Sequence, residues 1–404
     1  MKVLIAPSVA KGTVNAPCSK SYAHRLLIAA ALSDGTSVIE NVELNEDISA
    51  TIKCLQELGA NIQYCDHVIT VEGIKIRDNN AERSLFCNES GSTMRFLIPL
   101  SFVFSSKTIF TGAGRLMDRP QTVYEELFNS DTCYFKKEGN SFVSGGVLKS
   151  GKLMLRGDIS SQFITGLLFA LPLLDGDSEL VLTTSLQSEP YVDITIEVLK
   201  LFGVCIKKTQ AGYFIKGNQK FKSSKVTCQG DWSNSAFLHA FNLCGGNVQV
   251  TGLDSDSNQG DKVYLEYYSK LSESQPVLDI TKCPDLGPVL IACACLKNGA
   301  KLVGTSRLKI KESDRGEAMR QELLKFGVEI QVAEASITVP ACTLHAPKQE
   351  LNCHNDHRIA MSLAILCSVT GGTLNNAQCI NKSYPDFFDV IENLGIQVNR
   401  RCQK

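Results

Sequence analysis

The sequence has no charge excess and no long hydrophobic run. Its 404 residues contain 41 Lys and Arg against 42 Asp and Glu, which gives a formal net charge of −1. This balance argues against a protein that binds nucleic acid or an anionic membrane through a basic surface. Every apolar run is shorter than the roughly 20 residues of a membrane span, and the apolar segment in MKVLIA before Pro7 is too short for a signal peptide. We therefore expect a cytoplasmic protein whose partners are neither membranes nor nucleic acids.

Common signatures of cofactor chemistry are also missing. The sequence has no Walker A motif and no Gly-x-Gly-x-x-Gly after a strand, which argues against nucleoside triphosphates and dinucleotides. Its 16 cysteines include no Cys-x-x-Cys pair. Cys353, His354 and His357 are candidate metal ligands, but no partner spacing completes a tetrahedral site. Cys18, beside Lys20, fits packing better than an activated thiol. Most cysteines stand in apolar segments, so we expect reduced thiols.

What the sequence does contain is a unit repeated six times. Each copy has an apolar helix, a turn and a short β-rich strand, as in LLIAAALSDGTSVIENVEL at 26–44. The other copies occupy residues 96–116, 166–186, 236–253, 288–308 and 360–380. Helices of a second kind, with a charged face and a C-terminal glycine, alternate with the first kind. A helix that is apolar on all sides needs protein around it. The pattern predicts an inside-out α/β fold that divides into three and three repeats near Gln229-Gly230.

Cations stand at the starts of the apolar helices. Lys20, Arg25, Arg95 and Arg358 occupy the positive end of a helix macrodipole, which disfavours cations by about 0.3–1 kcal/mol each. Something negative must compensate them, and helix N-termini with Lys and Arg form phosphate and carboxylate sites. His24, in the same stretch, fits a structural role. Further cations lie in loops at Arg115, Arg119, Lys309, Lys311, Arg315 and Lys382. These residues predict small, polar ligands with several negative charges.

The order of these residues resembles the 5-enolpyruvylshikimate-3-phosphate synthase family over nearly the whole chain. The matching motifs are Lys20-Ser21-x-x-x-Arg25, Gly91-Ser92-Thr93-Met94-Arg95, Arg119-Pro120, Ser160-Ser161-Gln162, Pro284-Asp285, Lys311-Glu312-Ser313-Asp314-Arg315, Asn355-Asp356-His357-Arg358 and Lys382-Ser383-Tyr384-Pro385-Asp386. The resemblance implies two inside-out α/β barrel-like domains, each with three βαβαββ repeats and buried parallel helices. It implies a first domain of residues 17–229, a discontinuous second domain of 1–16 and 230–404, and an active site in the cleft between them.

The resemblance also implies a transferase of the shikimate pathway to chorismate and the aromatic amino acids. Such an enzyme moves the enolpyruvyl (1-carboxyvinyl) group of phosphoenolpyruvate to a hydroxyl of shikimate 3-phosphate and releases phosphate, as a monomer without metal or organic cofactor. Addition and elimination need a general acid and a general base. By resemblance, Asp285 acts at the shikimate hydroxyl, and Glu312 with Lys20 acts on the phosphoenolpyruvate side. The implied phosphoenolpyruvate site is Lys20, Gly91, Arg119, Gln162, Arg315, Arg358 and Lys382. The implied shikimate 3-phosphate site is Lys20, Ser21, Arg25, Ser160, Ser161, Gln162, Ser188, Tyr191, Asp285 and Lys311.

Two alternative functions remain at this point. The sibling UDP-N-acetylglucosamine 1-carboxyvinyltransferase family has the same sixfold architecture, but it has Lys-Asn near its start and a reactive Cys in the loop before Arg-Pro. Here Ser21 follows Lys20, and Gly114 stands in that loop. The other alternative is a non-catalytic anion-binding protein. Asp285 and Glu312 argue against it, because binding an anion needs no carboxylates.

The sequence departs from the family pattern at three positions. Ser92 stands where the family usually has Thr, Phe96 follows Arg95 in place of Pro or Leu, and Arg307 stands where an Asn often contacts the substrate. A bulky ring at position 96 is expected to tilt the helix start that presents Gly91. These departures bear on sensitivity to glyphosate more than on activity.

Overall fold

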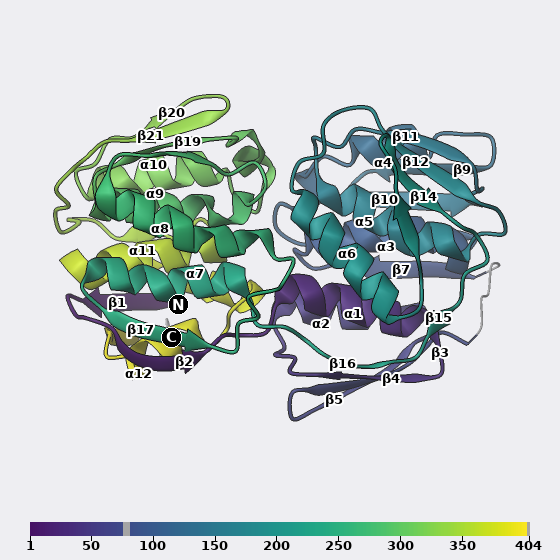
Figure 1. The fold of residues 1–404 in the computed structure, drawn as a ribbon, viewed down its shortest axis with the longest axis horizontal. Coiled ribbons are helices and arrows are strands. Elements are labelled where there is room, and N and C mark those ends of the chain that lie inside the picture. Colours follow the sequence, from purple (N-terminus) through teal and green to yellow (C-terminus); the bar gives the residue numbers. More distant parts are fainter. Residues whose placement is uncertain (76–80, 402–404) are drawn as a thin grey trace. The chain divides into compact units, whose positions relative to one another are not determined.

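The chain forms two compact units in the computed structural model, which describes residues 1–75 and 81–401. Unit 1 comprises Met1–Pro17 and Gly230–Lys404, and unit 2 comprises Cys18–Gln229 (Figure 1). Each unit has its own hydrophobic core. Pro17, which the sequence assigned to the first domain, belongs to unit 1. Its carbonyl oxygen accepts a hydrogen bond from the amide of Asp231 at 2.8 Å.

Unit 2 consists of three successive repeats with the same sheet topology. Its helices are α1 Lys20–Leu32, α2 Glu46–Glu57, α3 Gly91–Phe104, α4 Thr122–Leu127, α5 Ser161–Ala170 and α6 Glu189–Leu201, with 3-10 turns η1 Leu116–Asp118 and η2 Leu171–Leu173. Its strands are β3 Ser33–Asp34, β4 Thr36–Glu40, β5 Asn61–Cys65, β6 Val68–Glu72, β7 Glu82–Phe86, β8 Lys107–Thr111, β9 Cys133–Glu138, β10 Ser141–Gly146, β11 Lys152–Leu155, β12 Ser178–Leu182, β13 Ile206–Lys208, β14 Gly212–Ile215, β15 Phe221–Lys222 and β16 Lys225–Thr227. The four-stranded sheets have the orders β16-β4-β6-β5, β7-β8-β10-β9 and β11-β12-β14-β13. In each, the first two strands are parallel and the other pairs are antiparallel.

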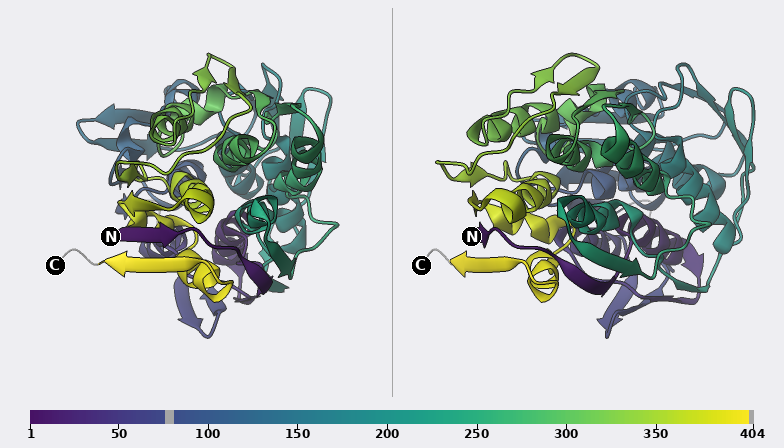
Figure 2. Two further views of the ribbon diagram at one scale, coloured as in Figure 1. Left: turned by 90° about the vertical axis from the view of Figure 1, so that its left-hand side faces the viewer. Right: turned by 60° about the vertical axis from the view of Figure 1, so that its left-hand side comes forward.

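Unit 1 repeats this plan with strands from both ends of the sequence. Its helices are α7 Trp232–Ala240, α8 Tyr264–Glu273, α9 Gly287–Leu296, α10 Arg315–Lys325, α11 His357–Thr370 and α12 Phe387–Asn393, with 3-10 turns η3 Phe241–Cys244, η4 Gly260–Val263, η5 Pro284–Leu286, η6 Ser306–Ile310 and η7 Ala377–Lys382. Its strands are β1 Lys2–Ala6, β2 Lys11–Asn15, β17 Asn247–Thr251, β18 Val277–Asp279, β19 Ala300–Val303, β20 Gln331–Val332, β21 Ser336–Val339, β22 Leu351–Asn352, β23 Gly372–Asn375 and β24 Gln397–Arg401. Two sheets, β18-β19-β21-β20 and β22-β23-β1-β24, have the same pairing as those of unit 2. Figure 2 shows β1 (purple) beside β24 (yellow).

The fourth repeat is shorter than the predicted βαβαββ unit. Its first strand, β2, pairs in parallel with β17, and these two form a sheet of their own. Helix α8 ends at Glu273 and β18, which begins the next repeat, starts at Val277. The intervening residues 274–276 are too few for the hairpin that closes the other five repeats.

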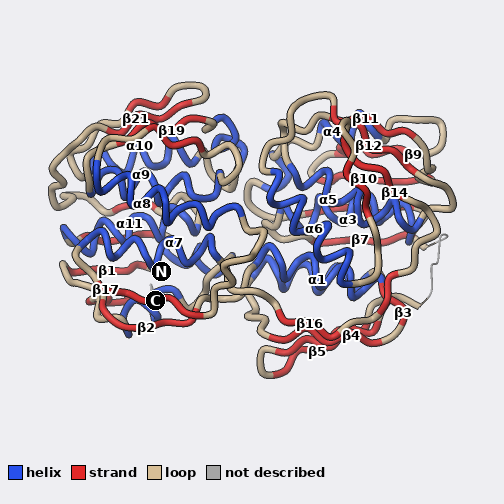
Figure 3. The backbone as a smooth tube through the Cα atoms, viewed as in Figure 1, coloured by secondary structure: helices blue, strands red, loops and turns tan. Residues whose placement is uncertain are grey.

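The six apolar helices form the interior of the two units. In α9 every residue except Leu296 is buried, and α1, α3, α5, α7 and α11 are buried almost as completely. Figure 3 shows the strands (red) outside the helices (blue), and the left view of Figure 2 shows helices of unit 1 nearly end-on. The predicted inside-out α/β class is therefore confirmed. Among residues 1–75 and 81–401, no helix is both long and apolar enough to cross a bilayer.

Helices α3 and α5 pack closely at a proline. Pro99 lies inside α3 and has no N–H for the carbonyl of Arg95, four residues earlier. The Tyr124 hydroxyl replaces it, 3.0 Å from that carbonyl oxygen and 2.8 Å from the carbonyl oxygen of Phe163 on α5. A Cβ at Gly166 would overlap both the Arg95 carbonyl and the Tyr124 hydroxyl. This contact fixes the first turns of α3 and α5, which carry several of the predicted site residues.

Candidate active site

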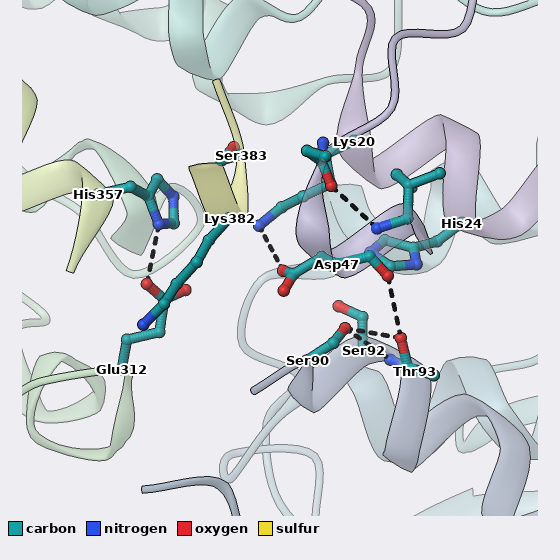
Figure 4. A network of polar contacts seen from close by, with 12 residues as sticks. Lys20, His24, Asp47, Ser90, Ser92, Thr93, Glu312, His357, Lys382 and Ser383 are labelled. Atoms are coloured by element: carbon teal, nitrogen blue, oxygen red, sulfur yellow. Dashed lines mark hydrogen bonds and ion pairs between the residues drawn. The ribbon is translucent and has the colours of Figure 1, made fainter. Parts of the chain in front are cut away.

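Lys20 begins α1 and already has a carboxylate partner. Its Nζ lies 2.8 Å from Oδ2 of Asp47, in the first turn of α2, and the two side chains are 16% and 9% exposed (Figure 4). His24, one turn further along α1, lies with Nδ1 2.8 Å from the Thr51 hydroxyl. Burial and the nearby cations hold the pKa of His24 well below its usual value, so the ring is neutral. Part of the negative charge that the sequence assigned to a ligand is thus supplied by Asp47.

Arg25, on the same helix, has only neutral partners among the described residues. Its Nε donates to the Thr195 hydroxyl at 2.8 Å, Nη1 to the carbonyl of Ser21 at 2.8 Å, and Nη2 to the carbonyl of Tyr191 at 2.9 Å. The guanidinium carbon stands 5.0 Å from the centre of the Phe96 ring, so the ring at this position packs against Arg25. Burial lowers the pKa of Arg25 to about 10, which leaves it charged at neutral pH. A buried guanidinium without a carboxylate partner is a strong anion-binding group.

The starts of α3 and α5 meet through Gln162. Its side-chain oxygen accepts from Nη1 of Arg95 at 2.8 Å, and its Nε2 donates to the Ser92 hydroxyl at 2.9 Å. A Cβ at Gly91 would lie 2.8 Å from Nη1 of Arg119, so the guanidinium covers the bare backbone there. Within residues 1–75 and 81–401, Nε of Arg119 is buried without a hydrogen-bond partner. Gly91, Arg119 and Gln162, predicted to bind phosphoenolpyruvate, are therefore brought together.

The serines predicted for shikimate 3-phosphate lie at two further helix starts. Ser160 caps α5 by accepting the amide of Gln162 at 3.3 Å, and Ser161 is the first residue of that helix. Ser188 precedes α6 with φ of 55°, and its carbonyl accepts the amide of Tyr191 at 3.1 Å. Because the Tyr191 carbonyl bonds to Arg25, the start of α6 is tied to α1.

In unit 1, Asp285 lies among three cations. Its Oδ1 is 3.0 Å from Nζ of Lys311 and 2.9 Å from Nη1 of Arg315, and its Oδ2 is 3.3 Å from Nη2 of Arg358. Burial raises the pKa of Asp285, but the charges of Arg358, Lys311 and Arg315 outweigh it and hold the pKa well below the usual value. The carboxylate is ionised and compensates one of the three positive charges. Side chains that the sequence assigned to substrate binding therefore hold Asp285 in its ionised form.

Asp356 is a buried partner of Arg315 that the sequence indicated only as part of a motif. Its Oδ2 accepts from Nε of Arg315 at 2.9 Å and from the Ser313 hydroxyl at 3.0 Å. Its Oδ1 is 3.3 Å from Nη2 of Arg315 and accepts the amide of Arg358 at 2.9 Å, which caps α11. Asp356 thereby positions two of the predicted phosphoenolpyruvate ligands.

Glu312 has a close neighbour, His357, that the sequence did not pair with it. Its Oε2 lies 2.8 Å from Nδ1 of His357 (Figure 4). Its Oε1 lies 3.9 Å from Nη2 of Arg315. Potential ligand atoms of Glu312, Asp356 and His357 lie within 4.8 Å of one another. Arg315 already occupies the Asp356 carboxylate, so its guanidinium holds the place that a cation would take.

Glu322, which no sequence motif indicated, supports the loop before α11. His354 and Asn355 have φ of 50° and 53°, in the left-handed region. The Glu322 side chain, 2% exposed, accepts the Asn352 amide at 2.8 Å and lies 2.9 Å from Nε2 of His354. The Asn355 carbonyl in turn accepts from Nζ of Lys382 at 2.6 Å. A buried carboxylate on α10 thus fixes the loop that leads into Asp356, His357 and Arg358.

The two units share one design. Buried helices begin in groups of Lys, Arg, Ser and Gly on repeated α/β units, and carboxylates lie among these cations. This fold and these groups define a class of α/β enzymes that act on small, multiply anionic molecules.

Comparison with known proteins identifies the family. The family model described as EPSP synthase (3-phosphoshikimate 1-carboxyvinyltransferase) matches residues 5–391. The 3-phosphoshikimate 1-carboxyvinyltransferase of Clostridium kluyveri is 40% identical over 427 residues, and that of Clostridium perfringens is 38% identical over 417 residues, each alignment covering 98% of both chains. A solved structure of EPSP synthase from Acinetobacter baumannii has the same fold, with a TM-score of 0.77 at 20% identity over 99% of this chain and 100% of that chain. The chain belongs to the EPSP synthase family, and the predicted family and transferase activity are confirmed.

Proposed function

We propose that this chain transfers the enolpyruvyl group of phosphoenolpyruvate to a hydroxyl of shikimate 3-phosphate and releases phosphate. Family membership supports the reaction. The observation that carries the substrate class is Arg25, a buried arginine whose described partners are all neutral oxygens. Such a charge needs an anion, and both substrates have a phosphate and a carboxylate.

The two substrates are proposed to bind different sets of residues. Phosphoenolpyruvate binds to Lys20, Gly91, Arg119, Gln162, Arg315, Arg358 and Lys382. Shikimate 3-phosphate binds to Lys20, Ser21, Arg25, Ser160, Ser161, Gln162, Ser188, Tyr191, Asp285 and Lys311. The hydrogen bonds that tie the starts of α1, α3, α5 and α6 together support the second set. The three cations around Asp285 support the contribution of unit 1 to both sets.

The chemistry is proposed to be addition followed by elimination. Asp285 is ionised, so it can take the proton from the attacking hydroxyl of shikimate 3-phosphate. Glu312 and Lys20 act on the phosphoenolpyruvate side, where the methylene carbon gains a proton on addition and loses one on elimination. The 2.8 Å contact between Glu312 and Nδ1 of His357 fixes the orientation of that carboxyl group. Lysine and arginine side chains stabilise the leaving phosphate.

Substituting the two proposed catalytic carboxylates tests these roles. We expect Asp285→Asn and Glu312→Gln each to lower turnover by about 10²–10⁴, the usual contribution of a general acid or base. Glu317→Gln is a matched control, because Glu317 is on the same unit, is 37% exposed and pairs with Arg320 at the surface. Near-wild-type single-turnover rates for either variant would remove that residue from the mechanism.

The choice of acceptor distinguishes this function from that of the sibling family. We expect phosphate release from phosphoenolpyruvate with shikimate 3-phosphate and none with UDP-N-acetylglucosamine, since Ser21 follows Lys20 and Gly114 stands in the loop before Arg119. The reverse preference would refute the proposal, and binding of shikimate 3-phosphate without turnover would support a non-catalytic protein. A cytoplasmic location, a monomeric state and activity without metal or cofactor stay predictions. The molecular mass from light scattering would test the monomeric state, and the activity in the presence of a chelator would test the independence from metal.

A further inference from the structure

A row of four buried polar side chains in unit 2 has no part in the mechanism proposed above. Nδ1 of His24 lies 2.8 Å from the Thr51 hydroxyl, which lies 2.7 Å from the Thr93 hydroxyl. The Thr93 hydroxyl in turn lies 2.7 Å from that of Ser90 (Figure 4). All four side chains are 1% exposed or less, so bulk water does not reach them. The row joins α1 and α2 to the residue that caps α3.

The directions of these hydrogen bonds depend on one another. Each hydroxyl donates one proton, and Ser90 Oγ already accepts the amide of Thr93 at 3.2 Å as the cap of α3. If the protons pointed away from His24, the Ser90 proton would have no acceptor among residues 1–75 and 81–401. The main-chain oxygen of Asp47 is 3.4 Å from the Thr93 hydroxyl, which is too long for a good O–H···O bond. Every hydroxyl proton has an acceptor within 2.8 Å in one arrangement only, in which all of them point toward His24.

This arrangement fixes the tautomer of His24. Nδ1 has to accept the Thr51 proton, so the ring carries its own proton on Nε2. Nε2 is buried and has no hydrogen-bond partner in the part of the chain that the structure describes. A neutral ring can accept at Nδ1, whereas a charged ring can only donate there. Burial in the core and the nearby cations Lys20 and Arg25 keep the ring neutral by lowering its pKa.

The start of α3 depends on the direction of the row. While the Ser90 hydroxyl donates to Thr93, it keeps a lone pair for the Thr93 amide, and the helix cap is complete. Gly91 and Ser92 follow the cap directly, and the Ser92 hydroxyl accepts from Nε2 of Gln162 at 2.9 Å. The row therefore ends beside two residues, Gly91 and Gln162, that are proposed to bind phosphoenolpyruvate.

We propose that His24 is a positioning residue for the phosphoenolpyruvate site. Its bare Nδ1 ends the row of hydroxyls, holds the Ser90 cap in one orientation and so sets the position of Gly91. This inference rests on the proposed function, because Gly91 is a ligand of phosphoenolpyruvate only under that proposal. It assigns His24 no contact with either substrate.

The tautomer of His24 can be measured without substrate. The protein has six histidines, and isotopic labelling of their ring nitrogens makes them visible in proton–nitrogen correlation spectra. At neutral pH, His24 should show a proton on Nε2 and a bare Nδ1, and the signal is identified by its loss in His24→Asn. A proton on Nδ1 of His24 would overturn the proposal, whether or not the protein transfers the enolpyruvyl group.

Thr51→Val interrupts the row at its centre with a side chain of nearly the same shape. We expect the KM for phosphoenolpyruvate to rise about three- to tenfold, the equivalent of one hydrogen bond, while kcat and the KM for shikimate 3-phosphate change less than about twofold. Hydrogen exchange of the Thr93 amide should become faster by a similar factor. Thr108→Val is the matched control, since the Thr108 hydroxyl is also buried and lies 2.7 Å from Ser105 Oγ at the C-terminal end of α3. This variant should leave both KM values and the Thr93 exchange unchanged.

The outcomes separate this inference from the function on which it rests. Equal rises of both KM values in Thr51→Val would show that the row only supports packing, because shikimate 3-phosphate is proposed to bind Arg25 on α1. An unchanged KM for phosphoenolpyruvate would also refute the inference. If the unsubstituted protein releases no phosphate with shikimate 3-phosphate, the proposed function fails. The tautomer of His24 and the exchange of the Thr93 amide then still decide whether His24 orders the start of α3.

Discussion

Replacing Asp356 by Asn should destabilise unit 1 and leave unit 2 unchanged. Asp356 is 0% exposed and accepts hydrogen bonds from Nε of Arg315, the Ser313 hydroxyl and the amide of Arg358. Asn keeps an oxygen for the amide of Arg358. The new NH2 group faces Nε of Arg315, which can only donate, so this hydrogen bond is lost, and the Ser313 hydroxyl has to turn from donor to acceptor. Arg315 keeps its contacts with Asp285, at 2.9 Å, and with Glu312, at 3.9 Å.

The expected loss of unfolding free energy is about 3 kcal/mol. Removing one partner of a buried ion pair costs about 3–5 kcal/mol, and the lower figure applies because Arg315 keeps Asp285. Burial raises the pKa of Asp356, but the charge and hydrogen bonds of Arg315 outweigh it, so the pKa lies below its ordinary value. A carboxylate with a depressed pKa stabilises the folded state above the unfolded value of about 3.9 and loses that effect as pH falls through the folded pKa. The difference between the two proteins should therefore be full at pH 7 and shrink below about pH 4.

Urea unfolding followed by tryptophan fluorescence measures this effect in one unit. The chain has a single Trp, Trp232, and it lies in unit 1. Asp47→Asn is a matched control, since it removes the partner of Lys20 in unit 2 and should leave the Trp232 transition unchanged. A shift below about 1 kcal/mol for Asp356→Asn at pH 7, or an equal shift for Asp47→Asn, would refute the reasoning.

Three further expectations concern other contacts. Glu322→Gln weakens the support of His354 and should raise KM for phosphoenolpyruvate about tenfold in steady-state kinetics; an unchanged KM would show that the loop holds its position without the carboxylate. Tyr124→Phe removes the hydroxyl that donates to the carbonyls of Arg95 and Phe163, and should destabilise unit 2 by about 1–3 kcal/mol, measured by hydrogen exchange in α3; unchanged exchange would contradict this. Burial lowers the pKa of Lys311 to about 8, so its charge is lost as pH rises through 8. Binding of shikimate 3-phosphate, measured by calorimetry, should weaken above pH 8 in the unsubstituted protein and not in Lys311→Arg; parallel profiles would exclude Lys311 as the titrating group.

The fold was predictable because its main signal is local. An apolar helix followed by a turn and a strand can be recognised in about 20 residues, and six copies make the inside-out arrangement clear. The spacing of the turn glycines also indicated that the fourth repeat is short. Gly246 and Gly299 are 53 residues apart, whereas Gly176 and Gly246 are 70 residues apart. The deficit of 17 residues matches the missing hairpin, but the interval alone does not say which element is absent.

The partners of the site residues were less predictable because they come from other elements. The sequence indicated that Lys20 needs a negative neighbour, but Asp47 is 27 residues away on α2. Glu322 lies two turns after Arg315 on α10, and nothing in the helix sequence distinguishes it from other helical glutamates. Its role depends on the contact with His354, which lies in a separate loop. Motifs identify the cations that we propose to bind the substrates. The carboxylates that hold these cations become visible only when the helices are packed.

The pairing of β1 with β23 and β24 determines the order in which the protein can mature during synthesis. All of unit 2, including β16, which completes the sheet of β4, has been made by Gln229, before α7 begins. At roughly 5–20 residues per second, residues 2–6 wait on the order of 20–70 s for residues 372–401 to be translated. Strand β1 is made before every other described strand and is therefore among the last to reach its native place, and an N-terminal fusion that delays it would affect the maturation of unit 1 alone.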